Sequence, residues 1–130
     1  MAHYLDTSAL AKLVVAEPET AALRAWLSEV DRDLVACDLA RTELLRAVRR
    51  VAPDRVLQAR AVLDSITLID LSASLFEQAG RLDPTTLRSL DAIHLAAALD
   101  LGDDLDGLVT YDDRLAEAAR SNGIAAVAPS

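Results

Sequence analysis

Short apolar runs alternate along this chain with longer segments in which apolar side chains recur every three or four residues. A short apolar run is typical of a buried strand, whereas apolar positions at helical spacing indicate an amphipathic helix. The short runs predict strands at residues 3–5, 34–37, 66–71, 108–110 and 124–127. The periodic segments predict helices at residues 8–15, 19–30, 39–51, 53–63, 72–82, 90–101 and 113–121. Strands that alternate with helices favour an α/β fold with a parallel sheet.

Polar residues that suit an N-cap mark the starts of several predicted helices. Thr7 or Ser8 is expected to cap the first helix, and Asp38 the helix at residues 39–51. Asp112 and Asp113 compete for two roles, as a site acid and as a cap of the last helix. We assign Asp112 to the site because it lies nearer the end of the preceding strand.

Length and composition fit a single globular domain over residues 1–130. Hydrophobic residues make up 52% of the chain and charged residues 26%. The longest uncharged internal run, at residues 92–99, is far shorter than the roughly 20 residues of a membrane span. Asp6 interrupts the N-terminus before an apolar segment can form, so we expect no secretory signal. Cys37 is the only cysteine, which rules out an internal disulfide and favours a cytoplasmic location.

The charge of the chain is acidic overall but unevenly distributed. A formal net charge of −8 argues against broad, nonspecific binding to nucleic acid, which requires a basic face. Six arginines nevertheless fall within residues 41–60, where the only acids are Glu43 and Asp54. A local basic face, with Arg46, Arg49 and Arg50 at its centre, is therefore expected on an acidic protein.

Four acids stand at positions that suit a functional site. Asp6 directly follows the first predicted strand, and Asp112 closely follows the fourth. Asp91 lies in the first turn of the most apolar helix, and Glu43 lies one turn into the helix at residues 39–51. Because parallel strands present their carboxyl ends at one edge of the sheet, where ligands bind in open α/β folds, we expect the four side chains to gather there.

Gathered carboxylates indicate a bound divalent cation. Like charges that are packed together raise one another's pKa, and a cation removes that cost. Mg²⁺ favours carboxylate oxygens and Mn²⁺ accepts the same ligands. Neither His3 nor His94 has a partner at the spacing of a zinc site, so zinc is not expected. A metal held in this way can activate water and stabilise charge on a phosphoryl group, which indicates phosphodiester hydrolysis.

Each acid also has a plainer interpretation. Asp6 is compatible with an ordinary helix start, and Asp91 with an N-terminal helix acid that the helix dipole favours. Glu43 is compatible with a solvated helix residue that pairs with Arg46 or Arg50.

Two hydroxyl groups accompany these acids. Ser8 and Thr110 each lie two residues from a proposed ligand and are suited to orient a metal-bound water or a carboxylate. Their alternatives are a helix cap for Ser8 and an ordinary strand residue for Thr110.

Four segments of the chain together resemble a PIN-domain ribonuclease of the VapC type, the toxin of a prokaryotic toxin–antitoxin pair. The segments are YLDTSALAKL at residues 4–13, RTELLRAV at 41–48, LRSLDAIHLAAAL at 87–99 and LVTYDDRLAEAA at 108–119. They occur in the order typical of the family and span nearly the whole chain.

The resemblance implies a three-layer α/β/α fold with a central parallel sheet of four to five strands, and a Mg²⁺- or Mn²⁺-dependent endoribonuclease. It places the family's acids on Asp6, Glu43, Asp91 and Asp112, with Asp6 and Asp91 as the principal metal ligands. Ser8 and Thr110 would be supporting polar groups. It also implies a homodimer, a cognate antitoxin that blocks the acids, and a heterotetramer or larger complex with it. Arg46, Arg49 and Arg50 would contact RNA phosphate or the antitoxin.

Two other functions are compatible with parts of the pattern. A PIN-like module that binds RNA or protein without cleaving it would differ only in how well its acids assemble. A phosphoacceptor signalling domain also gathers acids at strand ends, but it would need a lysine near the end of a late strand. The only lysine, Lys12, lies in the first predicted helix.

Overall fold

The computed structural model describes residues 1–130, and its central feature is a sheet of five parallel strands. The strands are β1 (Ala2–Leu5), β2 (Asp33–Cys37), β3 (Thr67–Ile69), β4 (Leu105–Val109) and β5 (Ala126–Val127), in the spatial order β3-β2-β1-β4-β5. The helices are α1 (Thr7–Lys12), α2 (Thr20–Ser28), α3 (Leu39–Val51), α4 (Val56–Asp64), α5 (Ala73–Gly80), α6 (Ser89–Leu99) and α7 (Asp113–Ser121). None of them combines the length and the apolar character that a membrane-spanning helix needs. The predicted α/β class with a parallel sheet is confirmed.

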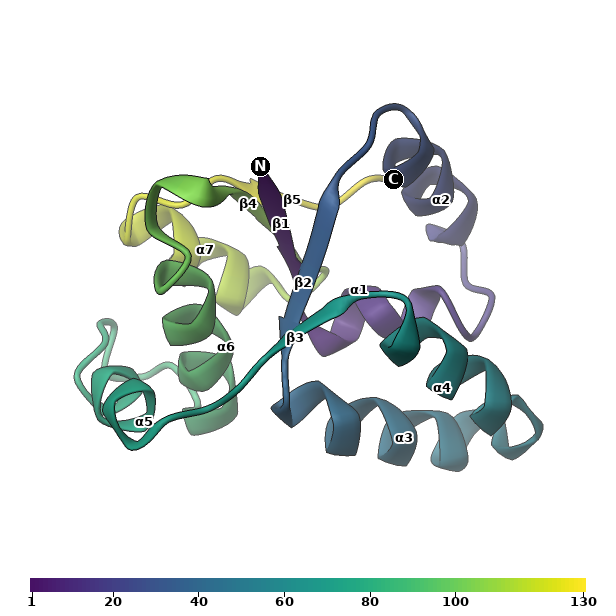
Figure 1. Ribbon diagram of the computed structural model, residues 1–130, viewed down its shortest axis with the longest axis horizontal. Helices are drawn as coiled ribbons and strands as arrows, with labels where there is room; N and C mark the ends of the chain where they lie inside the picture. The colour runs from purple at the N-terminus through teal and green to yellow at the C-terminus, as the bar shows by residue number, and fades with distance from the viewer.

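Helices cover both faces of the sheet because successive strand residues point to opposite sides. Tyr4 pairs in register with Val35 and with Leu108, and all three belong to the core under α5, α6 and α7. The residue that follows each of them faces the other way, into a core shared with α1, α2, α3 and α4. Figure 1 shows the two groups of helices on either side of the strands, which is the expected three-layer arrangement.

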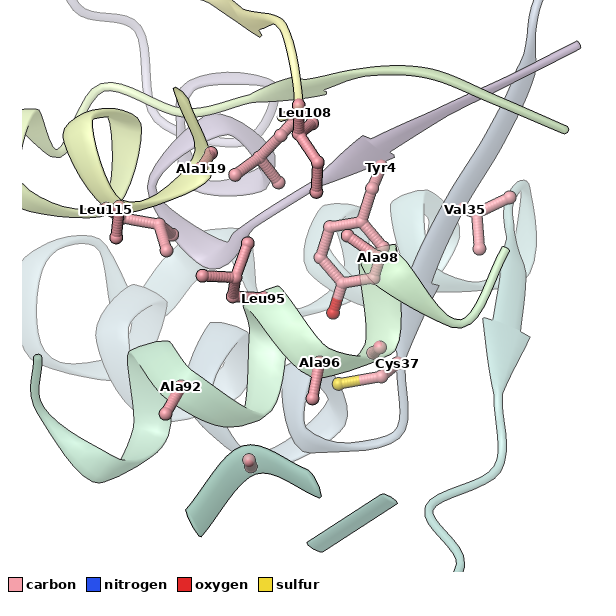
Figure 2. Close-up of a cluster of buried hydrophobic side chains, with 14 of the residues drawn as sticks. Tyr4, Val35, Cys37, Ala92, Leu95, Ala96, Ala98, Leu108, Leu115 and Ala119 are labelled. Carbon is pink, nitrogen blue, oxygen red and sulfur yellow. The ribbon is translucent and has the colours of Figure 1, made fainter. Parts of the chain in front are cut away.

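The core under α6 is packed closely because that helix presents mostly small side chains to the sheet. Alanines at positions 92, 96, 97 and 98 are at most 8% exposed. Tyr4 extends from β1 toward this helix, and its hydroxyl end and the sulfur of Cys37 point into the same space (Figure 2). Cys37 is fully buried and forms no disulfide, as expected of a small apolar residue at a strand end.

The caps of two helices differ from the prediction. Asp6, rather than Thr7 or Ser8, is the N-cap of α1, because the chain turns into the helix directly after β1 and the Asp6 side chain accepts from the Ala9 amide. Asp38 stands at the N-cap position of α3 but makes no capping hydrogen bond. Its backbone is already helical rather than extended, which directs the carboxylate to Arg41 instead.

Candidate functional site

Asp6 lies at the carboxyl edge of the sheet, where β1 and β4 end side by side. Its amide donates to the carbonyl of Val109 at 3.2 Å, and its side chain is almost completely enclosed, at 4% exposure. Both carboxylate oxygens accept hydroxyl hydrogen bonds. Ser8 Oγ donates to Oδ1 at 2.6 Å, and Thr110 Oγ1 donates to Oδ2 at 2.6 Å. Both hydroxyls thus orient a carboxylate, one of the two arrangements considered for them.

The environment of Asp6 is costly for a charged group. Burial raises the pKa of Asp6, and the hydrogen bonds from Ser8, Thr110 and the Ala9 amide offset that rise only in part. No lysine or arginine forms an ion pair with this carboxylate. Asp6 is therefore a buried, well-oriented carboxyl group without a lysine or arginine partner.

Glu43 is held by partners from α1 and α6 rather than by the arginines of its own helix. Its Oε1 accepts from Thr7 Oγ1 at 2.7 Å and from His94 Nε2 at 2.6 Å. His94 is 2% exposed, and its Nδ1 lies 2.8 Å from the Tyr4 hydroxyl oxygen and 3.9 Å from Cys37 Sγ. Glu43 is thus a half-buried member of a network across the sheet edge, and the alternative of a solvated partner of Arg46 or Arg50 is wrong.

The charge of His94 dominates this part of the site. Burial alone would lower the pKa of His94, but its contacts with Cys37 and Glu43 raise that pKa to about 10, so the ring is an imidazolium at neutral pH. Burial likewise opposes ionisation of Glu43, but the bonds from His94 and Thr7 leave its pKa lowered. Burial raises the pKa of both Asp6 and Asp91, and the imidazolium offsets a small part of that rise. Its field therefore reaches three of the four predicted acids.

His94 was not among the residues predicted to belong to the site. The available signal was its position: it is the one polar side chain in the apolar stretch at residues 92–99, and it lies three residues after Asp91. Residues three apart share a face of a helix. His94 therefore lies on the same face as a predicted site acid, in an otherwise apolar helix. This position indicates that His94 is a partner of one of the acids.

Asp91 and Asp112 approach each other from the N-terminal ends of two helices. Asp91 lies in the first turn of α6. Asp112 is the N-cap of α7, where its Oδ1 accepts from the amides of Arg114 and Leu115 at 2.9 and 3.3 Å. Burial and the neighbouring Asp112 both raise the pKa of Asp91, while Arg88 lowers it in part. Asp112, rather than Asp113, is thus the residue that caps α7.

Hydrogen bonds and ion pairs link several of the predicted residues along the sheet edge, but the acids do not surround a common point. Thr110 Oγ1 donates to Asp6 and accepts from the Asp112 amide at 3.0 Å. Arg88 links Asp112 to Asp91, and Arg88, Asp91 and Glu43 line one shallow pocket. No three histidine, cysteine or acidic side chains approach closely enough to enclose a metal ion.

The donor chemistry of this edge fits a hard divalent cation. All four acids offer carboxylate oxygens, the ligands that Mg²⁺ and Mn²⁺ favour. Burial disfavours the ionised form of Asp6, which has no ionic partner, and Asp91 and Asp112 repel each other. A bound cation would relieve both costs.

The three arginines predicted to contact a partner lie together on α3. Arg46, Arg49 and Arg50 are exposed and line a shallow depression of their own. Arg46 and Arg50 follow Glu43 by three and seven residues, so they share its side of the helix. None of them forms an ion pair with an acid of the chain. The depression is therefore a basic surface that begins beside the acid-rich edge.

Comparison with known proteins places the chain among ribonucleases. Residues 3–121 match the family model of the PIN domain. The chain is 43% identical over 130 residues to Ribonuclease VapC47 of Mycobacterium tuberculosis, covering 97% of this chain and 96% of that protein. It is 44% identical over 129 residues to Ribonuclease VapC46 of the same organism, covering 99% of this chain and 98% of that protein.

Two solved structures share this fold. The crystal structure of Mycobacterium tuberculosis VapC20, described as a Sarcin-Ricin loop cleaving toxin, superposes with a TM-score of 0.80 over 98% of this chain and 100% of that one, at 18% identity. A toxin–antitoxin complex from Klebsiella pneumoniae gives a TM-score of 0.75 over 100% of this chain and 98% of that one, at 20% identity. At these identities the likeness establishes the shared fold.

Proposed function

This chain belongs to the PIN-domain family, as a ribonuclease of the VapC type, and we propose that it cleaves RNA internally by divalent-metal-dependent hydrolysis at the sheet edge. The site would consist of Asp6, Glu43, Asp91 and Asp112. The observation that carries this proposal is the buried Asp6 carboxylate, which two hydroxyl groups orient and which no lysine or arginine neutralises. A structural helix cap alone would need neither the burial nor the hydroxyl groups.

Asp6 and Asp91 would be the principal ligands of a Mg²⁺ or Mn²⁺ ion, and Glu43 and Asp112 would complete the set directly or through water. A divalent cation supplies positive charge that makes water a better nucleophile and stabilises the phosphoryl group under attack. Two of the acids keep one oxygen out of the hydrogen bonds that hold them in place, although Asp112 Oδ2 is contacted by Arg88. Glu43 uses Oε1 for both of its hydrogen bonds, and Asp112 uses Oδ1 for both of its capping bonds.

The chain's own residues keep these ligands in position. Ser8, Thr110 and the Ala9 amide fix the orientation of Asp6. Thr7 and His94 hold Glu43 against the edge of the sheet, and the imidazolium of His94 offsets part of the negative charge of the acids. Second-sphere hydrogen bonds of this kind orient ligands and tune metal sites in proteins.

The chain would act as the toxin of a toxin–antitoxin pair, with RNA as substrate and a cognate antitoxin that blocks the acids. The basic surface of Arg46, Arg49 and Arg50 would bind RNA phosphate or acidic groups of the antitoxin. The toxin would form homodimers, which join the antitoxin in a heterotetramer or larger complex. A cytoplasmic location is consistent with this role.

Incubating total cellular RNA with the purified, antitoxin-free protein tests the proposal. The reactions contain Mg²⁺, Mn²⁺ or EDTA, and Asp6→Ala is compared with Asp64→Ala, which removes an exposed acid at the end of α4. Discrete fragments that require both the metal and Asp6, but not Asp64, are the expected result. A folded protein that yields no fragments under any condition would instead favour a module that binds RNA or protein without cleaving it.

A further inference from the structure

Arg88 lies between two of the four acids, and the function proposed above gives it no role. Its Nε lies 3.4 Å from Asp91 Oδ2, and its Nη2 lies 3.3 Å from Asp112 Oδ2. The side chain is nevertheless 67% exposed. Long contacts made by an exposed arginine are weak, because the side chain gives up conformational freedom to hold them and water screens the charges. The bridge is therefore easily opened.

The place of Arg88 in the chain gives it room to move. It directly precedes α6 in an extended conformation, so its side chain crosses from the start of α6 to the start of α7. Arg88 and Asp91 together line two neighbouring shallow pockets, one shared with Glu43 and the other with Arg114. A guanidinium in this position can leave the acids without disturbing the core.

The bridge occupies the oxygens that a metal would need. Arg88 contacts Oδ2 of Asp112, the oxygen that is not used for capping α7. It also contacts the Asp91 carboxylate, whose repulsion from Asp112 is otherwise uncompensated by any lysine or arginine. In the metal-free protein, Arg88 thus supplies the positive charge between these two acids.

We propose that Arg88 is a placeholder that holds Asp91 and Asp112 until a divalent cation displaces it, after which its guanidinium binds a phosphate of the RNA. The planar guanidinium matches carboxylate and phosphate geometry alike, so one group can serve in both states. This inference rests on the proposed function, because it requires Asp91 and Asp112 to bind the metal.

Arg114 provides a matched control for the charge of Arg88. It is an exposed arginine in the first turn of α7 and lines the pocket that contains Arg88 and Asp91, but it forms no ion pair. Arg88→Gln and Arg114→Gln each remove one positive charge beside the same pocket. Only Arg88→Gln also removes the bridge between the acids.

The test measures Mn²⁺ affinity of the RNA-free protein by isothermal titration calorimetry, for wild type, both glutamine variants and Asp91→Asn. Arg88→Gln should bind Mn²⁺ about fivefold more tightly, because two weak ion pairs no longer compete, and Arg114→Gln should change affinity by less than about twofold. With saturating Mn²⁺, Arg88→Gln should raise KM for RNA by about tenfold, since one charge-assisted phosphate contact is lost. Tighter metal binding together with weaker RNA binding is a combination that a merely structural role would not produce.

Two results would overturn the inference: equal changes of Mn²⁺ affinity in Arg88→Gln and Arg114→Gln, or a KM for RNA that Arg88→Gln leaves unchanged. Asp91→Asn separates this failure from failure of the proposed function. If Asp91→Asn weakens Mn²⁺ binding while the glutamine variants behave alike, only the role of Arg88 is refuted. If Asp91→Asn binds Mn²⁺ as the wild type does, the metal site itself is refuted.

Discussion

Replacing His94 with leucine should strongly destabilise the protein, because it removes a buried cation and leaves Glu43 without its closest partner. The ring is 2% exposed and lies 2.6 Å from Glu43 Oε1 and 2.8 Å from the Tyr4 hydroxyl. Leucine is similar in size and apolar, so the loss would come from these polar contacts rather than from a cavity. Thr7 would remain as the only hydrogen-bond partner of the Glu43 carboxylate.

The expected magnitude follows from the burial of the pair. Breaking a buried ion pair by removing one partner costs about 3–5 kcal/mol of stability. Because Glu43 is only half-buried, we expect His94→Leu to lower the free energy of unfolding by about 3 kcal/mol. With a urea dependence of about 1.5 kcal/mol per molar, the unfolding midpoint would fall by about 2 M. His94→Gln, which can still donate one hydrogen bond to Glu43, should lose only about 1 kcal/mol.

The pH dependence gives this prediction a second, independent readout. The pKa of His94 is raised from 6.5 to about 10 in the folded protein. A raised pKa contributes stability that is complete below about pH 6.5 and is lost as the pH rises through about 10. The difference in unfolding free energy between wild type and His94→Leu should therefore narrow between these two values.

His3 supplies a control for the pH dependence, because burial and then Arg32 lower its pKa instead of raising it. The stability that His3 contributes is complete above pH 6.5 and is lost only below that value, as the pH falls through its lowered pKa. His3→Gln should therefore keep the wild-type pH dependence above that value. A His94→Leu variant that loses less than about 1 kcal/mol, or a difference that stays constant across the window, would refute the buried imidazolium–carboxylate pair.

Two further predictions concern the acids and the basic surface. Burial raises the pKa of Asp6, so the metal-free protein loses stability as the pH rises through that pKa. Asp6→Asn should therefore melt about 3 °C higher than the wild type in EDTA, and Mn²⁺ should no longer stabilise it. A melting temperature in EDTA that calorimetry finds below that of the wild type would contradict this. Arg46→Glu with Arg50→Glu should weaken RNA or antitoxin binding by more than about tenfold and reduce the salt dependence of RNA binding, whereas Arg55→Glu with Arg60→Glu should not. Fluorescence anisotropy in EDTA measures both, and unchanged affinity for RNA and antitoxin would place the contact elsewhere.

The arrangement of the sheet was predictable because its strands are short apolar runs that end in polar residues. The step from Leu5 to Asp6 marks the end of β1 in the sequence itself. Parallel pairing then requires Asp6 and Thr110 to meet at one edge, and the structure joins them by a hydrogen bond. The strand limits were less predictable, since β4 begins at Leu105, three residues before the predicted start of that strand.

The sequence could not show that one carboxylate can fill two roles at once. Asp6 and Asp112 were each weighed as either a helix cap or a site acid. In the structure, Asp112 caps α7 with Oδ1 and meets Arg88 with Oδ2. Asp6 likewise caps α1 while it accepts from Thr110 with its other oxygen. Such sharing depends on side-chain geometry, which spacing along the chain does not describe.

The contacts of His94 and Arg88 were also beyond sequence reasoning. His94 meets Glu43 across 51 positions of the chain, and Arg88 meets Asp112 across 24. A histidine in an apolar helix and an arginine at a helix start are both ordinary features by themselves. Their acid partners come from α3, which directly follows β2 in the chain, and from α7, and α6 packs against both β2 and α7.

The most direct test of the account is the rate of RNA cleavage by Asp91→Asn in saturating Mn²⁺, compared with Asp100→Asn. The two substitutions are identical in kind and lie at opposite ends of α6, Asp91 beside the other acids and Asp100 exposed at the C-cap. We predict that Asp91→Asn remains folded but loses cleavage, while Asp100→Asn cleaves at the wild-type rate. Cleavage by folded Asp91→Asn at the wild-type rate would contradict the assignment of the active site.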